Sequence, residues 1–203
     1  MKNAFSEVVI AGAGPTTFDY NDFAKISEPV FFINRMHKFS DGCLSEHQYF
    51  FTHHITEFQE VKPTTIHIEK MYYDYLDYKG FLTAQARPKN RHIAIDVQAT
   101  EEVIDKEFLE THPWLLDKKE VIRRNRLLAG FGSVTTAIYM AWFVGAKQVT
   151  MIGCNPDSQS AAHDDRLCKM GLSPHKAMIY GPDKIKENTR VMPDLLGLNV
   201  LHV

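Results

Sequence analysis

The chain lacks long apolar stretches. No run of about 18 apolar residues, the length that a membrane-spanning helix needs, occurs in it. Residues 1–7, MKNAFSE, also lack the apolar segment of a secretory signal. We therefore expect a cytoplasmic protein without an integral membrane segment.

Cysteine is scarce, with only Cys43, Cys154 and Cys168 in the chain. An odd number without a CxxC pair argues against a disulfide framework and against a zinc site. The cysteine content predicts a reducing compartment. We expect no metal and no resident cofactor.

The sequence has no excess of charge of one sign, since 23 basic residues stand against 25 acidic ones and the formal net charge is −2. A nucleic acid would need a broad positive field, so we expect no nucleic-acid partner. The 203 residues, 44% of them hydrophobic, suffice for one sizeable core. Because no linker or repeat interrupts them, we expect a single domain over residues 1–203. The sequence does not decide whether the protein forms a homo-oligomer.

Short apolar runs alternate with helical patterns. The predicted strands are residues 8–10, 29–34, 49–52, 64–67, 148–152 and 198–203. Continuous apolar runs are typical of strands that are buried on both faces. This alternation predicts an α/β fold, a Rossmann-like parallel sheet wrapped by helices, with a small loop-rich insertion or lid at residues 71–92.

The clearest predicted helix covers residues 133–144, with Ser133 as its N-cap and Gly145 at its end. Further helical patterns cover residues 18–26, residues 100–109 with Thr100 as a cap, and part of residues 114–128. The last of these carries three arginines, which we interpret as a solvated helix face: Arg123, Arg124 and Arg126.

The stretch VVIAGAGPTT at residues 8–17 raises the question whether the chain has a dinucleotide-binding turn. An apolar strand is followed by Gly12 and Gly14, whose missing Cβ atoms let the backbone turn tightly and approach a ligand. A dinucleotide-binding fingerprint needs a third glycine where this chain has Thr17. The dinucleotide motif is therefore incomplete.

Ligands of a parallel sheet bind beyond the carboxyl ends of its strands. This rule brings five segments to one rim, residues 12–16, 34–35, 52–53, 133 and 153–157. Each segment also has a purely structural interpretation, for example a tight turn for the glycines and a helix cap for Ser133.

Three segments together resemble the bacterial sialyltransferases of glycosyltransferase family 42: AGAGPTT at 11–17, PVFFIN at 29–34 and GSVTTAIYMAWFVGAKQVTMIGCN at 132–155. Enzymes of that family use CMP-sialic acid as donor. The resemblance implies a glycosyltransferase that moves sialic acid, or a related keto sugar, from a CMP-activated donor to a glycan acceptor.

The resemblance assigns eight residues to the nucleotide: Gly12, Gly14, Pro15, Thr16, Asn34, Ser133, Gly153 and Asn155. Thr16 stands where the family has serine, and Asn155 stands where it has aspartate. Asn34 matches the asparagine that contacts the cytidine nucleotide, and Ser133 matches the serine that opens the following helix.

The catalytic positions depart further from the family pattern. Its second nucleotide-contacting asparagine falls near residues 52–53, and its two phosphate-binding tyrosines fall near Asp157 and His163. Its catalytic histidine falls within residues 175–186, where no gap-free alignment supplies one. His175 is the nearest histidine and the candidate general base, and His163 is the candidate phosphate partner.

Two alternatives stay open. Arg35 follows the second strand, where an NADP-dependent oxidoreductase places a cation for the 2′-phosphate, although Thr17 and the lack of a Y-x-x-x-K pattern count against that class. A noncatalytic CMP-binding or nucleotide-binding relative, which kept the pocket and lost the base, is the other alternative.

Overall fold

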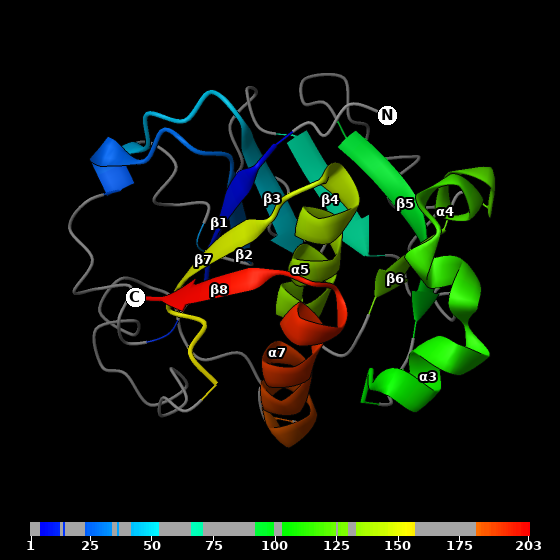
Figure 1. Ribbon diagram of the computed structural model, residues 1–203. Coiled ribbons are helices and arrows are strands. Elements are labelled where there is room, and N and C mark those ends of the chain that lie inside the picture. The colour runs from blue at the N-terminus through cyan, green and yellow to red at the C-terminus, as the bar shows by residue number, and fades with distance from the viewer. Residues whose placement is uncertain are drawn as a thin grey trace.

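The computed structural model describes residues 5–12, 14, 23–33, 36, 42–52, 66–70, 92–99, 103–124, 126–129, 133–156 and 182–203. Its eight strands form one sheet in the order β6-β5-β4-β3-β2-β1-β7-β8 (Figure 1). Every pair of neighbouring strands is parallel. The predicted α/β class with a parallel sheet is therefore confirmed.

The strands are β1 (Glu7–Ala11), β2 (Val30–Ile33), β3 (Gln48–Thr52), β4 (Ile66–Lys70), β5 (His92–Ala99), β6 (Arg126–Ala129), β7 (Gln148–Ile152) and β8 (Asn199–His202). Six of them lie where the apolar runs predict strands. β5 and β6 were not predicted, because β5 adjoins the polar stretch assigned to the insertion and β6 has only four residues. Of the predicted insertion over residues 71–92, His92 belongs to β5 instead, and residues 71–91 lie outside the described residues.

The helices are η1 (Phe23–Lys25), α3 (Lys106–Thr111), η4 (Pro113–Leu116), α4 (Lys118–Arg124), α5 (Ser133–Val144) and α7 (Pro182–Leu195). α5 has the predicted bounds, and the N–H of Gly145 closes its end by donating to the Trp142 carbonyl at 3.0 Å. α7 was not predicted, since Pro182 and Pro193 interrupt its pattern in the sequence.

Three other helices were predicted. Of the predicted helix over 18–26, residues 18–22 lie outside the described residues, and the described part contains only the short 3-10 helix η1. The structure corrects the two remaining predictions. α3 begins at Lys106 because Asp105 is its N-cap, with a carboxylate that accepts a hydrogen bond from the Phe108 N–H at 2.8 Å. The predicted helix over 114–128 is divided, and Arg126 belongs to β6 instead of a helix. On α4 the other two arginines are exposed and pair with Glu120, which confirms a solvated face for Arg123 and Arg124.

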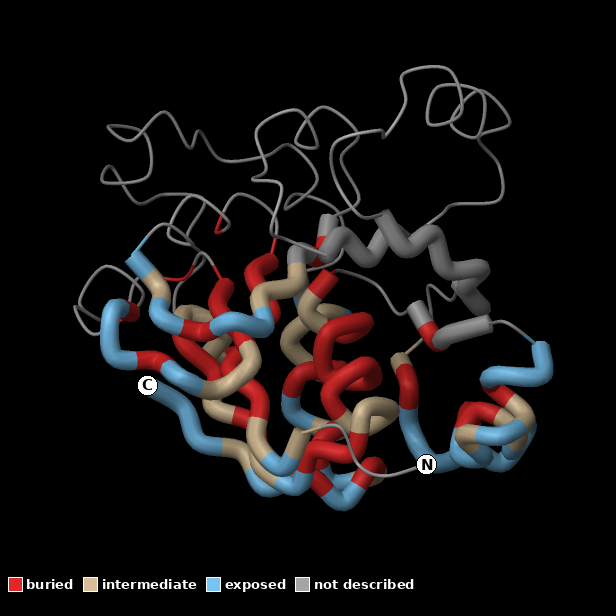
Figure 2. The backbone as a smooth tube through the Cα atoms, turned by 90° about the horizontal axis from the view of Figure 1, so that it is seen from above, coloured by how far each residue is buried: buried red, intermediate tan, exposed pale blue. Residues whose placement is uncertain are grey.

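Both faces of β1 and β2 are covered. Val8 and Ile10 of β1 pack into the core under α5 and α7, whereas Val9 and Ala11 pack into a second core with residues of η1. Burial on both faces explains why these strands are continuous apolar runs. β8 lies at the edge of the sheet and is mostly exposed (Figure 2).

α5 crosses the sheet against β1, β2, β3 and β6 and packs beside α7 (Figure 1). Because α5 follows β6, it begins at the carboxyl edge of the sheet and returns the chain to the start of β7. None of the helices in the described ranges is long and apolar enough to cross a membrane.

Candidate functional site

The strand order reverses its direction between β1 and β7. From β1 the chain continues outward through β2 to β6, and α5 then returns it to β7 on the other side of β1. Ala11 and Ile152, the last residues of these two strands, are paired in register. Such a reversal is the topological switch point where open parallel sheets bind ligands.

Two backbone hydrogen bonds join the loops beyond these strands. The Gly12 N–H donates to the Ile152 carbonyl at 2.8 Å, and the Gly14 N–H donates to the Gly153 carbonyl at 2.8 Å. Both N–H groups are therefore used within the protein. The two glycines contribute a close approach of the loops, and phosphate donors must come from other groups at this edge.

The loops approach so closely that neither position has room for a side chain. A Cβ at Gly14 would lie 2.8 Å from the carbonyl carbon of Gly153, and one at Gly12 would lie 2.9 Å from the Gly153 oxygen. A Cβ at Gly12 would also overlap the Cys154 sulfur. Gly153 has a φ of 63°, a left-handed conformation that favours glycine. Three glycines are thus required at the switch point for steric and conformational reasons.

The two residues after Gly153, Cys154 and Asn155, contribute no charge to this loop at neutral pH. Burial raises the pKa of the Cys154 thiol to about 12, against a smaller opposite effect of the Gly12 N–H. The thiol is therefore protonated at neutral pH and is no nucleophile. Asn155, where the family pattern has aspartate, is half-buried and adds no negative charge to a site for a phosphate.

The start of α5 supplies polar groups at the same edge of the sheet. Ser133, Thr135 and Thr136 are all buried in its first turn. The Oγ1 atom of Thr136 has no hydrogen-bond partner within the described part of the chain. The first N–H groups of a helix are not used inside it and favour a negative charge. This turn is the described group of donors best suited to a phosphate.

Five of the predicted site residues are described. The structure brings Gly12, Gly14 and Gly153 together, with Asn155 in the same loop and Ser133 at the start of α5. The other five lie outside the described ranges and stay predictions: Pro15, Thr16, Asn34, His163 and His175. No group of three metal-ligating side chains occurs among the residues that the structure covers.

Sequence reasoning placed Cys154 within the rim segment 153–157 but gave it no role, and in the structure it contributes to the tight fit around Gly12. Its position directly after Gly153, at the end of a predicted strand, was the available signal. It also missed a pocket between α7 and β8, which Pro156 of the same loop lines together with Arg190 and His202. That pocket depends on α7, a helix that the sequence pattern did not predict.

The fold and site define an α/β protein whose parallel sheet has a topological switch point between β1 and β7. No protein-family model matches the chain. No curated protein sequence matches it either.

Among solved structures, the chain is similar to the monofunctional α-2,3-sialyltransferase Cst-I from Campylobacter jejuni, with a TM-score of 0.50 and 14% identity over 100% of this chain and 77% of that chain. It is also similar to the sialyltransferase CST-II in complex with a trisaccharide acceptor and CMP, with a TM-score of 0.46 and 14% identity over 97% and 80% of the two chains. At these identities, the similarity to Cst-I shows a common fold.

Proposed function

We propose that the protein is a glycosyltransferase that transfers sialic acid, or a related keto sugar, from a CMP-activated donor to a glycan acceptor. The observation that carries this proposal is the glycine-dependent junction of the β1 and β7 loops at the switch point. The motif resemblance to family 42 and the fold common with the sialyltransferase Cst-I support it.

The chemistry of such a transfer suits the described groups. As the bond between the anomeric carbon and CMP breaks, negative charge builds on the departing phosphate. The first turn of α5, which contains Ser133 and Thr136, lies at the carboxyl edge of the sheet, and the start of a helix favours such a negative charge. We assign Thr16 to the same phosphate and Asn34 to the cytidine nucleotide.

The acceptor hydroxyl loses its proton as it bonds to the anomeric carbon, so the reaction needs a general base. We assign this role to His175, because imidazole titrates near neutral pH, and we place His163 at the leaving phosphate. Cys154 is excluded from this role, since burial raises its thiol pKa to about 12.

Ligand-induced stabilisation separates the candidate functions. CMP should raise the midpoint of thermal unfolding and NADP should not, because a ligand that binds only the folded state stabilises it. Stabilisation by NADP with no effect of CMP would replace the proposal by the oxidoreductase alternative. CMP binding without any transfer or hydrolysis of CMP-sialic acid would favour a noncatalytic relative.

Substitutions at the assigned residues test the site directly. Asn34→Ala should weaken CMP binding by roughly 1–3 kcal/mol, the usual cost of leaving polar groups unpaired. The matched control is Asn199→Ala, because Asn199 is exposed at the start of the edge strand β8. Equal CMP affinities of the two variants in isothermal titration would remove Asn34 from the site.

The base assignment is tested by turnover. His175→Ala should lower the rate of sialyl transfer by about 10²- to 10⁴-fold with little change in CMP affinity. His163→Ala should have a smaller effect on the rate. His112→Gln is the control, since His112 caps the end of α3 away from the switch point. Full rates in both alanine variants would show that neither histidine is the base.

A further inference from the structure

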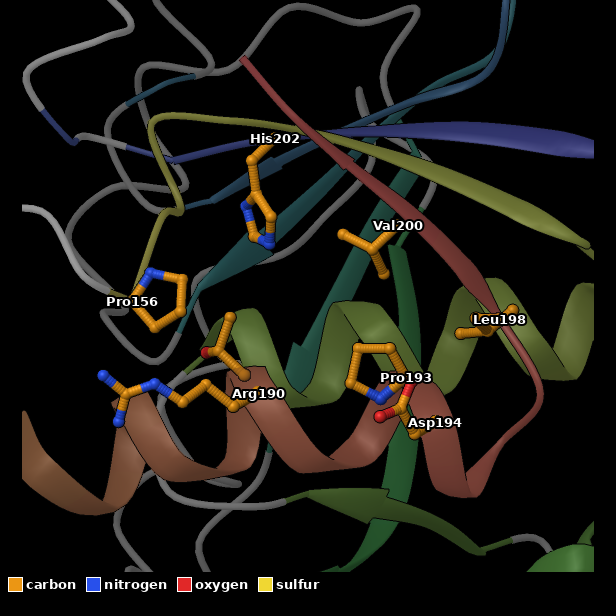
Figure 3. A pocket seen from close by; sticks show the side chains of 8 residues that line it. Pro156, Arg190, Pro193, Asp194, Leu198, Val200 and His202 are labelled. Atoms are coloured by element: carbon orange, nitrogen blue, oxygen red, sulfur yellow. The ribbon is translucent and has the colours of Figure 1, made fainter.

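A hollow, which we call the α7–β8 pocket, lies between α7, β8 and the loop after β7 (Figure 3). Its volume is about 320 Å³. Its polar lining consists of Thr189, Arg190, Asp194 and His202, and its apolar lining includes Pro156, Pro193 and Val200. A hollow with apolar walls and a few polar groups is the usual form of a site for a small ligand.

The pocket lies at the edge of the sheet that carries the proposed donor site. His202 is the last residue of β8, and its imidazole reaches from the strand toward α7 (Figure 3). Pro156 belongs to the loop that begins at Gly153, so this loop lines the pocket and also forms the junction with the β1 loop. A ligand in the pocket would therefore lie next to a donor bound at the switch point.

The charges in the lining indicate what kind of ligand fits. Arg190 and Asp194 are one helical turn apart on α7, and both are exposed. The Asp194 carboxylate would repel an anion, and the Arg190 guanidinium, which also pairs with the Glu187 carboxylate at 3.6 Å, would repel a metal ion. A neutral ligand with many hydroxyl groups meets neither repulsion, since each hydroxyl both donates and accepts hydrogen bonds.

The remaining lining residues favour the same class of ligand. Pro193 has no N–H. The carbonyl of Thr189, four residues before it, therefore lacks its usual helical donor and is an acceptor on α7. The Thr189 hydroxyl donates to the Ile185 carbonyl at 2.7 Å and is part of the wall. Pro156, Pro193 and Val200 offer an apolar surface to the C–H face of a sugar ring.

We propose that the α7–β8 pocket binds a neutral sugar ring, and that this ring belongs to the glycan acceptor. The second part rests on the proposed function, because only a glycosyltransferase needs an acceptor beside its donor. Asp194 accepts hydroxyl protons of the sugar, Arg190 and His202 donate to its oxygens, and the prolines contact its ring.

The test uses the full chain and the methyl glycosides of galactose, glucose and mannose as probes. Saturation-transfer NMR should show binding of at least one glycoside at millimolar concentration. Asp194→Asn and Arg190→Gln should each weaken that binding about tenfold, the effect of one hydrogen bond to a charged group. Lys184→Gln, an exposed change outside the pocket on the same helix, should leave it unchanged.

Thermal unfolding of each variant verifies its fold, which should persist because Arg190 and Asp194 are exposed. No binding of any glycoside, or binding that both pocket variants leave unchanged, would overturn the proposal. Binding of inorganic phosphate in place of the glycosides would show an anion site and would also overturn it.

A CMP titration of the same samples separates this proposal from the proposed function. CMP binding without glycoside binding would reject the pocket alone. Glycoside binding that depends on Asp194, without CMP binding, would support the sugar pocket and reject the transferase.

Discussion

At the switch point, single residues have no room for a larger side chain. Gly12 and Gly14 lie against the backbone of Gly153 and the sulfur of Cys154, and their N–H groups hold the β7 loop. The glycine pattern, which in a dinucleotide-binding protein serves the ligand directly, here serves the contact between two loops. The geometry of this edge of the sheet therefore depends on both loops together.

Gly14→Ala should destabilise the protein by roughly 1–3 kcal/mol, because a Cβ would lie 2.8 Å from the Gly153 carbonyl carbon and 3.0 Å from its Cα, so the backbone must shift. Urea unfolding measures this loss. Gly42→Ala is the matched control, since nothing lies within 4 Å of a Cβ there, and its stability should be unchanged or slightly higher. Equal losses in the two variants would contradict the close packing.

Cys154 should react slowly with iodoacetamide. Burial raises its pKa to about 12, so about one thiol in 10,000 is ionised at pH 8. Mass spectrometry after timed alkylation should show little label at this position in the folded protein and rapid labelling in urea. Cys43, whose pKa burial also raises, provides an internal comparison. Rapid labelling of Cys154 without denaturant would show that its thiol is not buried.

Two contacts between distant elements fix the helices that position the site. Asn188 of α7 accepts a hydrogen bond from the buried Ile104 N–H at 2.7 Å, which joins α7 to the segment before α3. Tyr139 of α5 donates to the Leu115 carbonyl at 2.5 Å, which joins α5 to η4. Both side chains are fully buried, so these bonds form where water is excluded.

Asn188→Ala should cost roughly 1–3 kcal/mol in the free energy of unfolding, because it leaves the Ile104 N–H buried without its acceptor. Urea unfolding of this variant is compared with that of Lys184→Ala, an exposed change on the same helix. Since α7 lines the sugar pocket, Asn188→Ala should also weaken glycoside binding. A stability equal to that of the Lys184 variant would rule out this anchoring role.

Tyr139→Phe should lower the free energy of unfolding by about 0.5–1.5 kcal/mol. The substitution keeps the ring in the core and removes only the hydroxyl that donates to the Leu115 carbonyl. CMP affinity should be unchanged, because the hydroxyl contacts η4 and not the switch point. A loss of CMP affinity with unchanged stability would mean that this tyrosine acts on the site instead.

The stability of the whole molecule should fall in alkaline solution. Burial raises the pKa of Cys154 from 9.0 to about 12 and also raises that of Tyr139. Above pH 9 the unfolded chain loses the Cys154 proton while the folded protein keeps it, so the unfolded state is favoured. This contribution is complete below pH 9 and is lost as the pH rises to about 12.

Urea unfolding between pH 8 and pH 11 measures this dependence. Cys154→Ala should make the decline shallower, because it removes one of the groups whose pKa burial raises. A decline of the same steepness in the variant would exclude Cys154 as a cause.

Local sequence patterns predicted those helices and strands whose own residues favour the structure that they adopt. α5 was predicted with its observed bounds because it is apolar and begins with a capping serine. α7 was not predicted because its two prolines are unfavourable in a helix, and tertiary contacts stabilise it instead. β6 was not predicted because four residues show too little periodicity. The same holds for the candidate site. Its glycines were predicted from the local turn pattern, whereas the α7–β8 pocket, which depends on tertiary contacts, was not.

The sequence by itself determined the strands β1, β2, β3 and β7, α5 and the need for glycine after β1, because these features depend on neighbouring residues and on the period of the apolar pattern. The tertiary structure alone decided that β7 lies beside β1, which places Gly14 against Gly153 and requires the missing Cβ. It also brought Pro156, Arg190 and His202 around one pocket. Such contacts join segments far apart in the chain, and they follow from the order of strands in the sheet, which no local pattern specifies.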